Sequence, residues 1–440
     1  MARKLFGTDG VRGVAGELLT AELALGLGRA ATALAAAERP QVLIIRDTRE
    51  SGEMLQAALA AGVSAAGGDA LLGGVLPTPA APLLIARYGF DLAAVISASH
   101  NPYQDNGIKF FGADGFKLSD ETELEIEREL ERGEAPLVDA IGGVRELRGT
   151  GEDYLRALHT RFAELDLKGL NVLLDCANGA THRVAPEIFR RLGATVSVLA
   201  DAPDGRNINA GCGSTHVQEL ARHVLAGGHD LGFAFDGDGD RVLAVDGAGE
   251  VVDGDELMAL AALHLKRTGR LTGGGVAVTV MTNYGFHSAM RGAQIAVAST
   301  QVGDRYVLEE LRARGWVLGG EQSGHIIDIG FNRSGDGIAS ALLVLEALGG
   351  APLSGRDAMH KLPQRLVNVR VRDRGALEGA DTVNKAVRAA DAELSGRGRV
   401  LVRPSGTEPL VRVMVEAPTD AEADTVCARL VALVERELAS

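Results

Sequence analysis

Short apolar runs recur along the chain, and most of them stop at a turn rich in polar residues and glycine. Two examples are "DLAAVISASHNP" (91–102) and "LGFAFDGDGDR" (231–241). The same plan returns at 41–52, 171–180, 275–283 and 316–325. Between these runs lie Ala- and Leu-rich stretches of helical character, such as "AELALGLGRAATALAAAE", and Ser51 is expected to cap one helix. Nearly continuous apolar strands that alternate with helices predict parallel sheets covered on both faces.

The C-terminal part of the chain follows a different pattern. Three strand-like runs, "LVNVRVRD", "RVLVRPSG" and "LVRVMVEAP", stand close together, and a single helix ends the sequence. This order is typical of an α+β unit. We therefore predict three α/β domains with mixed or parallel sheets, followed by a smaller α+β domain. Turn- and linker-like segments place the domains at 1–150, 151–252, 253–364 and 365–440.

Composition narrows the class of protein. The 440 residues are 46% hydrophobic and 24% charged, as in soluble globular proteins. No apolar run approaches the ~20 residues that span a bilayer. The three cysteines are too few and too scattered for a disulfide framework or a zinc site, and no secretory signal is apparent, so we expect a cytoplasmic protein. A net charge of −14 argues against a nucleic-acid partner.

The first candidate site follows the strand that ends at Ile96. In parallel sheets ligands collect at the carboxyl ends of the strands, and "SASHNP" is placed there. Ser99 beside His100 could be a nucleophile with an adjacent base. The alternative is a polar turn in which Ser and Asn bond to the local backbone.

The segment "FDGDGDR" is more informative. Asp236, Asp238 and Asp240 alternate with glycine, so an extended chain points them to one side. Three carboxylates this close repel one another unless a cation lies among them, and oxygen ligands suit Mg²⁺. An EF-hand loop would need Gly and Glu where this chain has Arg241 and Gly247. The alternative is an exposed Asp-Gly turn.

Two further loops carry candidate ligand-binding groups. "GGEQSGH" offers Glu321, Ser323 and His325, which suit sugar hydroxyls, although an ordinary polar loop has the same composition. "RPSGTEPLVR" has the residue types of a phosphate cradle, and its alternative is a surface turn with a salt bridge. The cradle residues are Arg403, Ser405, Gly406, Thr407 and Arg412.

Together these loops predict phosphoryl transfer. A serine would accept and donate the phosphoryl group, a three-Asp metal site would neutralise charge, and one loop would hold a sugar. A second phosphate site is superfluous for hydrolysis, but a mutase needs it to hold one phosphate while the other moves.

The chain resembles the α-D-phosphohexomutases. The resemblance runs through "LFGTDGVRG", "ISASHNPYQDNGIKFF", "DGDGDR", "TQVGDRYV", "GGEQSGH" and "RPSGTEPLVRVMVE", in family order over nearly the whole chain. The opening motif and Gln322 are similar to the glucosamine branch of the family rather than the phosphomannomutase branch. The family's fold implies four domains around a central cleft, and the oligomer it implies is a homodimer.

The resemblance also implies a role for each matching residue. Ser99 corresponds to the family's phosphoserine, and its phosphate joins the three aspartates as a ligand of one Mg²⁺. Arg12, Lys109 and Arg241 correspond to basic residues of the reaction centre. Lys109 is a candidate for proton transfer if its pKa is lowered, and otherwise it pairs with phosphate. His100 and His325 are candidates for hydrogen bonding or proton transfer. Glu321 and Ser323 match the sugar loop, and the cradle residues match the phosphate loop.

The implied reaction interconverts glucosamine 6-phosphate and glucosamine 1-phosphate through a sugar 1,6-bisphosphate. A phosphomannomutase or phosphoglucomutase would use the same chemistry on another hexose. A metal-dependent sugar phosphatase would release inorganic phosphate, and a binding protein without activity would carry no transferable phosphate. No membrane or nucleic-acid partner is expected.

Overall fold

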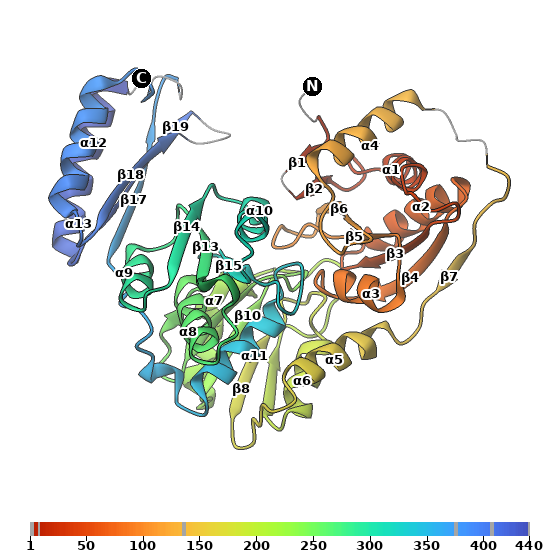
Figure 1. Ribbon diagram of the computed structural model, residues 1–440, viewed down its shortest axis with the longest axis horizontal. Helices are drawn as coiled ribbons and strands as arrows, with labels where there is room; N and C mark the ends of the chain where they lie inside the picture. Colours follow the sequence, from red (N-terminus) through yellow and green to blue (C-terminus); the bar gives the residue numbers. More distant parts are fainter. Residues whose placement is uncertain (1–3, 8, 134–137, 374–376, 405–408, 439–440) are drawn as a thin grey trace. The chain divides into compact units, whose positions relative to one another are not determined.

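The computed structural model describes residues 4–7, 9–133, 138–373, 377–404 and 409–438. The chain divides into two compact units, whose elements are labelled in Figure 1. The larger unit comprises Met1–Met281 and Ala296–Arg356, and the smaller comprises Thr282–Ile295 and Asp357–Ser440. The larger unit holds three sheets and the smaller unit holds a fourth.

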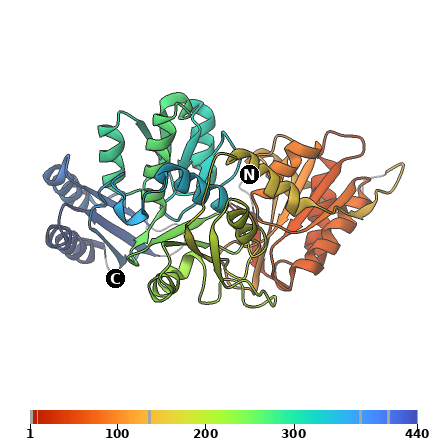
Figure 2. The same cartoon turned by 90° about the horizontal axis from the view of Figure 1, so that it is seen from below.

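The first sheet has seven strands in the order β1-β2-β6-β5-β3-β4-β7. Its central strands are buried on both faces, since Val42 to Ile45 of β3 are all inaccessible to solvent. Val42 and Ile44 belong to the core that β3 shares with α1 and α2, and α3 packs against β3 and β5. Figure 2 shows helices above and below this sheet. The elements are β1 (Phe6–Gly7), β2 (Gly10–Val14), α1 (Ala21–Ala33), β3 (Gln41–Arg46), α2 (Gly52–Ala65), β4 (Asp69–Val75), α3 (Ala80–Tyr88), β5 (Leu92–Ile96), β6 (Asp105–Gly112), α4 (Asp120–Arg132) and β7 (Val144–Glu146).

The second and third sheets have five and four strands, in the orders β12-β11-β10-β8-β9 and β14-β13-β15-β16. The second part contains α5 (Thr150–Arg161), β8 (Asn171–Asp175), α6 (Val184–Arg191), β9 (Thr195–Leu199), α7 (Val217–Gly227), β10 (Leu231–Phe235), β11 (Val242–Asp246) and β12 (Val251–Val252). The third contains α8 (Gly254–Arg267), β13 (Gly275–Thr279), β14 (Ala296–Thr300), α10 (Asp304–Arg314), β15 (Leu318–Gly320), β16 (Ile326–Asp328) and α11 (Gly337–Leu348).

The three sheets share one arrangement of four strands. The orders β6-β5-β3-β4, β11-β10-β8-β9 and β16-β15-β13-β14 are equivalent. In each, three strands are parallel and the fourth returns antiparallel beside the third. The loop before each antiparallel strand therefore occupies the same place in its sheet. We call these the serine loop (97–104), the aspartate loop (236–241) and the glutamate loop (321–325).

The smaller unit is an antiparallel sheet with helices. Its order is β17-β19-β18, and Val411, Val413 and Val415 of β19 enter a core with α12 and α13. The elements are α9 (Tyr284–Gly292), β17 (Gln364–Arg370), α12 (Asp381–Leu394), β18 (Arg399–Pro404), β19 (Leu410–Glu416) and α13 (Asp420–Leu438). The backbone N–H of Tyr284 donates to the buried Glu416, 2.7 Å away, which ties α9 to this sheet.

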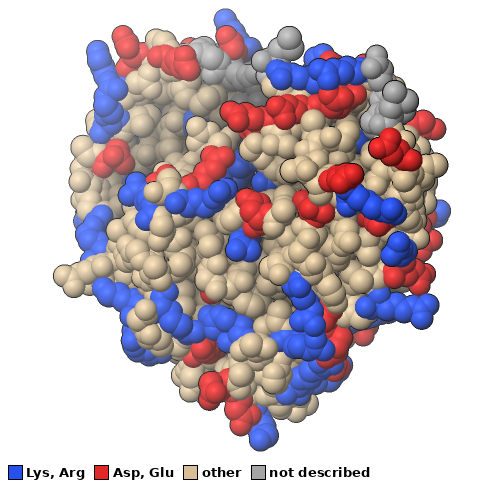
Figure 3. All heavy atoms as spheres, turned by 45° about the vertical axis from the view of Figure 1, so that its right-hand side comes forward, with Lys and Arg blue, Asp and Glu red and all other residues tan. Residues whose placement is uncertain are grey.

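The predicted fold class is confirmed, whereas one local prediction is wrong. Ser51 has helical backbone angles and makes no cap hydrogen bond to α2; its Oγ accepts instead from Asn106. Among the described residues, no helix is both long and apolar enough to span a bilayer. Figure 3 shows acidic and basic side chains together on one face of the molecule.

Candidate active site

Ser99 and Ser97 have different surroundings in the serine loop. Ser99 Oγ donates to Asp236 Oδ2 at 2.5 Å and lies 3.2 Å from His100 Nδ1. Ser97 Oγ donates to Asp47 Oδ2 at 2.5 Å and accepts the N–H of Ser99 at 3.0 Å. Ser99 therefore faces the aspartate loop, while Ser97 supports the backbone of its own loop.

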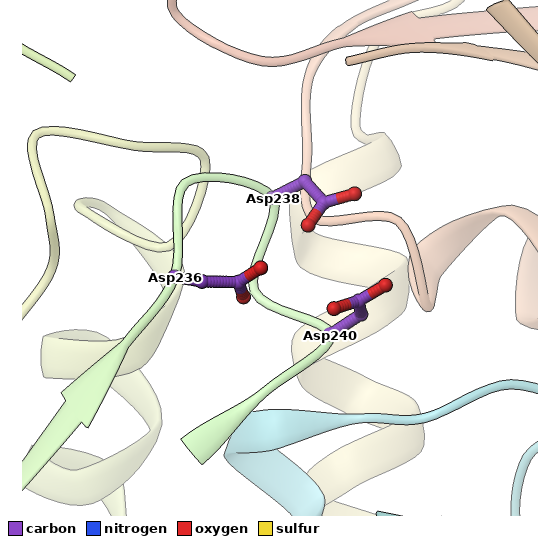
Figure 4. Close-up of side chains that lie close together, drawn as sticks. All are labelled: Asp236, Asp238 and Asp240. Atoms are coloured by element: carbon purple, nitrogen blue, oxygen red, sulfur yellow. The ribbon is translucent and has the colours of Figure 1, made fainter. Parts of the chain in front are cut away.

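The aspartate loop brings its three carboxylates together, as Figure 4 shows. All three side chains are buried, and one oxygen from each lies within 4.8 Å of the others. Burial, with the charges of Asp240 and Asp238, raises the pKa of Asp236 well above its usual range. Among the described residues, Oδ1 of Asp238 and Oδ1 of Asp240 are buried without a hydrogen-bond donor. Buried oxygens without donors fit a divalent cation.

Lys109 of β6 lies beside these carboxylates. Its Nζ is 2.9 Å from Asp238 Oδ2, 3.4 Å from Asp9 Oδ2 and 3.8 Å from Asp240 Oδ2. Burial opposes the charge of the ammonium, but Asp238, Asp9 and Asp240 outweigh it and raise the pKa of Lys109. Lys109 therefore pairs with the carboxylates in this structure.

Arg12 and Arg241 contribute positive charge at the same place. Arg12 of β2 forms an ion pair with Asp9, and Arg241 Nε lies 3.9 Å from Asp240 Oδ1. In the described part of the chain, the Nε of each arginine is buried and has no acceptor. The two guanidinium groups thus have donors left for an anionic ligand.

The same two charges act on His100. Burial, with the charges of Arg241 and Arg12, lowers the pKa of His100 to about 4.

The glutamate loop places His325 between two carboxylates. His325 Nδ1 lies 3.5 Å from Asp240 Oδ1, and its Nε2 lies 3.6 Å from Asp304 Oδ2. Burial lowers the pKa of His325, but Asp240 and Asp304 outweigh burial and raise it. Glu321 is buried and accepts the N–H of Gly303 at 3.0 Å, whereas Ser323 is exposed.

Several side chains that lie at this centre were not among the candidates predicted from the sequence. Lys117 forms ion pairs with Asp9 and with Asp304, the latter at 2.5 Å. Thr78 Oγ1 donates to Asp238 Oδ2 at 2.6 Å. Asp9 and Asp304 lie inside the motifs "LFGTDGVRG" and "TQVGDRYV". These motifs were the sequence signal that could have identified both residues as candidates. Lys117 and Thr78 have no comparable local pattern.

Arg403 and Arg412 lie opposite one another on β18 and β19 of the smaller unit. Burial and the charge of Arg412 lower the pKa of Arg403. The predicted cradle residues Ser405, Gly406 and Thr407 lie outside the described residues. The described part of the cradle is therefore a cross-strand pair of guanidinium groups.

The sequence matches four domain models of one family. Their descriptions are phosphoglucomutase/phosphomannomutase alpha/beta/alpha domains I, II and III and the C-terminal domain, matched at residues 3–136, 152–249, 253–366 and 366–433. Among solved structures, a phosphoglucomutase/phosphomannomutase family protein from Burkholderia thailandensis has a TM-score of 0.82 at 24% identity, covering 99% of this chain and 98% of that one. An Aspergillus fumigatus N-acetylphosphoglucosamine mutase has a TM-score of 0.69 at 19% identity, covering 99% and 96%. These structures show the fold.

Two curated relatives are much closer in sequence. The phosphoglucosamine mutase of Moorella thermoacetica is 52% identical over 436 residues, which cover 97% of this chain and 98% of the relative. The phosphoglucosamine mutase of Bacillus subtilis is 48% identical over 444 residues, covering 99% of both. The chain therefore belongs to the phosphoglucomutase/phosphomannomutase family and, within it, to the phosphoglucosamine mutases.

Proposed function

We propose that this chain interconverts glucosamine 6-phosphate and glucosamine 1-phosphate, with Ser99 carrying the phosphoryl group. The observation that supports this most is the 2.5 Å hydrogen bond from Ser99 Oγ to Asp236, within a buried cluster of three carboxylates. This contact supports the proposal, because a cation held by the cluster would lie next to a phosphate carried by the serine oxygen. The near-50% identity to phosphoglucosamine mutases supports the amino sugar as substrate.

The proposed cofactor is one Mg²⁺, held by Asp236, Asp238, Asp240 and an oxygen of phospho-Ser99. When bound, it supplies positive charge against the phosphoryl group that moves. Lys109 keeps its charge beside Asp238 and Asp9 and so limits repulsion within the cluster. Arg12 and Arg241 bind phosphate oxygens through the donors that lack acceptors.

The reaction has two half-steps. In the first, the bond from phosphorus to Ser99 Oγ breaks, and a bond forms from phosphorus to the free hydroxyl of the sugar phosphate. The hydroxyl loses its proton to a nearby base, for which His100 and His325 are the candidates. Ser99 Oγ takes up a proton as it leaves. In the second half-step the 1,6-bisphosphate has turned over, so that its other phosphoryl group faces Ser99: the bond from phosphorus to the sugar oxygen breaks, a bond from phosphorus to Ser99 Oγ forms, the serine proton passes to the sugar oxygen through the same base, and the isomeric monophosphate leaves.

The remaining candidate residues bind the parts of the substrate that do not react. Glu321 and Ser323 would bond to sugar hydroxyls. Arg403 and Arg412, with Ser405, Gly406 and Thr407, would hold the phosphate that is not being transferred. The four domains at 1–150, 151–252, 253–364 and 365–440 and the homodimer stay predictions.

The test is an NMR time course with Mg²⁺, a trace of sugar 1,6-bisphosphate, and either glucosamine 6-phosphate or glucose 6-phosphate. We expect the 1-phosphate to form much faster from the amino sugar. A preference for glucose would overturn the substrate assignment, and release of inorganic phosphate alone would indicate a phosphatase. Ser99→Ala should abolish transfer yet bind the phosphosugar; residual turnover would exclude Ser99 as the phosphoryl carrier.

A further inference from the structure

Two backbone carbonyls of the serine loop each receive two hydrogen bonds from the same pair of side chains. Arg49 Nη2 donates to the carbonyl of Ser99 and to that of Asn101, both at 2.9 Å. Asn209 Nδ2 donates to the same carbonyls at 2.9 and 3.0 Å. The loop that presents Ser99 is therefore held by two side chains, one from a residue that follows β3 and one from a residue that follows β9.

Arg49 is entirely buried beneath the serine loop. Its Nε donates to Asp47 Oδ2 at 2.9 Å, and Nη1 donates to the carbonyls of Pro102 and Asp105, at 2.5 and 3.0 Å. The guanidinium group thus makes five hydrogen bonds, four of them to carbonyls of residues 99–105. A planar fork of donors makes this pattern, and the single ammonium of a lysine cannot.

Asn209 comes from a loop fixed to the end of β8. The Asp175 carboxylate accepts the N–H of Ala177 at 2.9 Å and that of Gly213 at 2.7 Å, and Asn209 N–H donates to the Ala177 carbonyl. Both polar neighbours of the Asn209 amide are carbonyl oxygens, so its NH₂ must face them. Its Oδ1 is buried and has no donor within the described ranges. The amide is therefore directed at the serine loop alone.

The backbone at this junction departs from ordinary conformations. Ser99 has φ of 52°, and Ala177, Asn178 and Asn209 have φ of 54°, 48° and 58°. Side-chain-bearing residues adopt these left-handed angles rarely, and surrounding contacts must hold them. The bonds to the Ser99 carbonyl are such contacts, because they fix the peptide plane that follows the left-handed residue.

We propose that Arg49 and Asn209 are positioning residues that hold Ser99 in its left-handed conformation, so that Oγ points at Asp236. This inference rests on the proposed role of Ser99. Neither side chain touches the reacting atoms; each acts through the carbonyls of Ser99 and Asn101. Because Asn209 belongs to the second sheet's part of the chain, the direction of Ser99 depends on how that part docks against the serine loop.

The test uses Asn209→Ala, Asn209→Asp and Arg49→Lys in the full-length protein, with Asn207→Ala as control. Asn207 is in the same loop, but among the described residues its side chain bonds to Asp204 and Ala202 and not to the serine loop. The measurements are kcat, KM for glucosamine 6-phosphate, the melting temperature, and the ³¹P resonance of phospho-Ser99.

We expect Asn209→Ala and Arg49→Lys to lower kcat by roughly 10- to 100-fold, the size expected when a reacting group moves by about 1 Å. KM should change less than about threefold, because the sugar and phosphate groups are bound elsewhere. The ³¹P resonance should shift or broaden. Asn209→Asp should be at least as impaired, since a carboxylate cannot donate to either carbonyl.

Unchanged kcat in folded Asn209→Ala and Arg49→Lys would overturn the inference. So would equal losses in Asn209→Ala and Asn207→Ala, because loop integrity would then explain both. If Asn209→Ala fails to fold, Arg49→Lys decides by the same readouts. Turnover by Ser99→Ala would instead refute the proposed function, so the two failures are distinguishable.

Discussion

Replacing Gly237 with alanine tests how tightly the aspartate loop approaches the serine loop. An ideal Cβ on Gly237 would lie 2.6 Å from the Ser99 carbonyl oxygen, 2.8 Å from Asn209 Nδ2 and 2.8 Å from Ile208 Cδ1. The methyl group would therefore reach the serine loop and the side chain that holds it.

The size of the effect follows from these distances. Nonbonded heavy atoms are most stable roughly 3.5–4.0 Å apart, so the two loops must separate by roughly 0.7–1.4 Å. A shift of about 1 Å at a reacting group lowers the rate by about 100-fold, and inserting a methyl group into a packed site costs about 1–3 kcal/mol of stability. We expect Gly237→Ala to lower kcat by about 10- to 100-fold and to lower the melting temperature.

The assay is the NMR time course together with thermal unfolding, and Gly151→Ala is the matched control. A Cβ on Gly151 of α5 would meet Leu76 and Val184 at 3.9 and 4.0 Å, which are ordinary contacts. That variant should keep full activity and gain about 0.4–1 kcal/mol of stability. If Gly237→Ala matched Gly151→Ala in kcat and melting temperature, the close approach of the two loops would not set the geometry of Ser99.

Three further variants test other parts of the site. Asp238→Asn should lose most of the stabilisation that Mg²⁺ gives the folded protein, which for a single site reaches about 2.7 kcal/mol at 100 times Kd. Thermal unfolding with Mg²⁺ and with a chelator measures this stabilisation. An equal rise in melting temperature with Mg²⁺ in the variant and the parent protein would place the metal elsewhere. Asp336 is buried, and burial outweighs its hydrogen bonds from Ala339 and Tyr154 and raises its pKa from 3.8 to about 6. The folded state therefore keeps a proton that the unfolded chain has lost, so this carboxyl contributes stability below about pH 4 that disappears as the pH rises through about 6. The melting-temperature difference between the parent protein and Asp336→Asn should shrink over that range, and parallel curves would contradict this sign. Arg403→Ala should raise KM by roughly 10- to 100-fold, from the loss of a charge-assisted bond worth about 1.5–3 kcal/mol. A lower melting temperature with unchanged KM would make Arg403 structural.

The sequence predicted the parts of the fold whose signals are local. Buried strands such as β3, β5 and β10 are continuous apolar runs that end at polar turns, and each was placed within a few residues. The grouping of α9 with the C-terminal sheet had no such signal. It depends on contacts such as that of Tyr284 with Glu416, which are 132 residues apart.

The same distinction holds for the candidate site. Ser99 and the three aspartates could be singled out because their chemistry is concentrated in two short motifs, and the structure brings them together. Arg49 and Asn209 were missed because an arginine after a strand and an asparagine in a polar loop are common. Their roles appear only when carbonyls about 50 and 110 residues away come within hydrogen-bond distance. Ser51 was wrongly expected to be a cap for the same reason, since its partner Asn106 is distant in sequence.

The repeated four-strand arrangement explains how one centre draws on three sheets. Each sheet presents one loop at the end of an equivalent strand, and the three loops carry different side chains. The serine and aspartate loops meet through Ser99 and Asp236, and the aspartate and glutamate loops meet through Asp240 and His325. Because each contact joins different sheets, the distance between reacting groups is set by how the sheets dock and not by any single loop. Side chains at these junctions that touch no substrate, such as Asn209, should therefore also affect the rate.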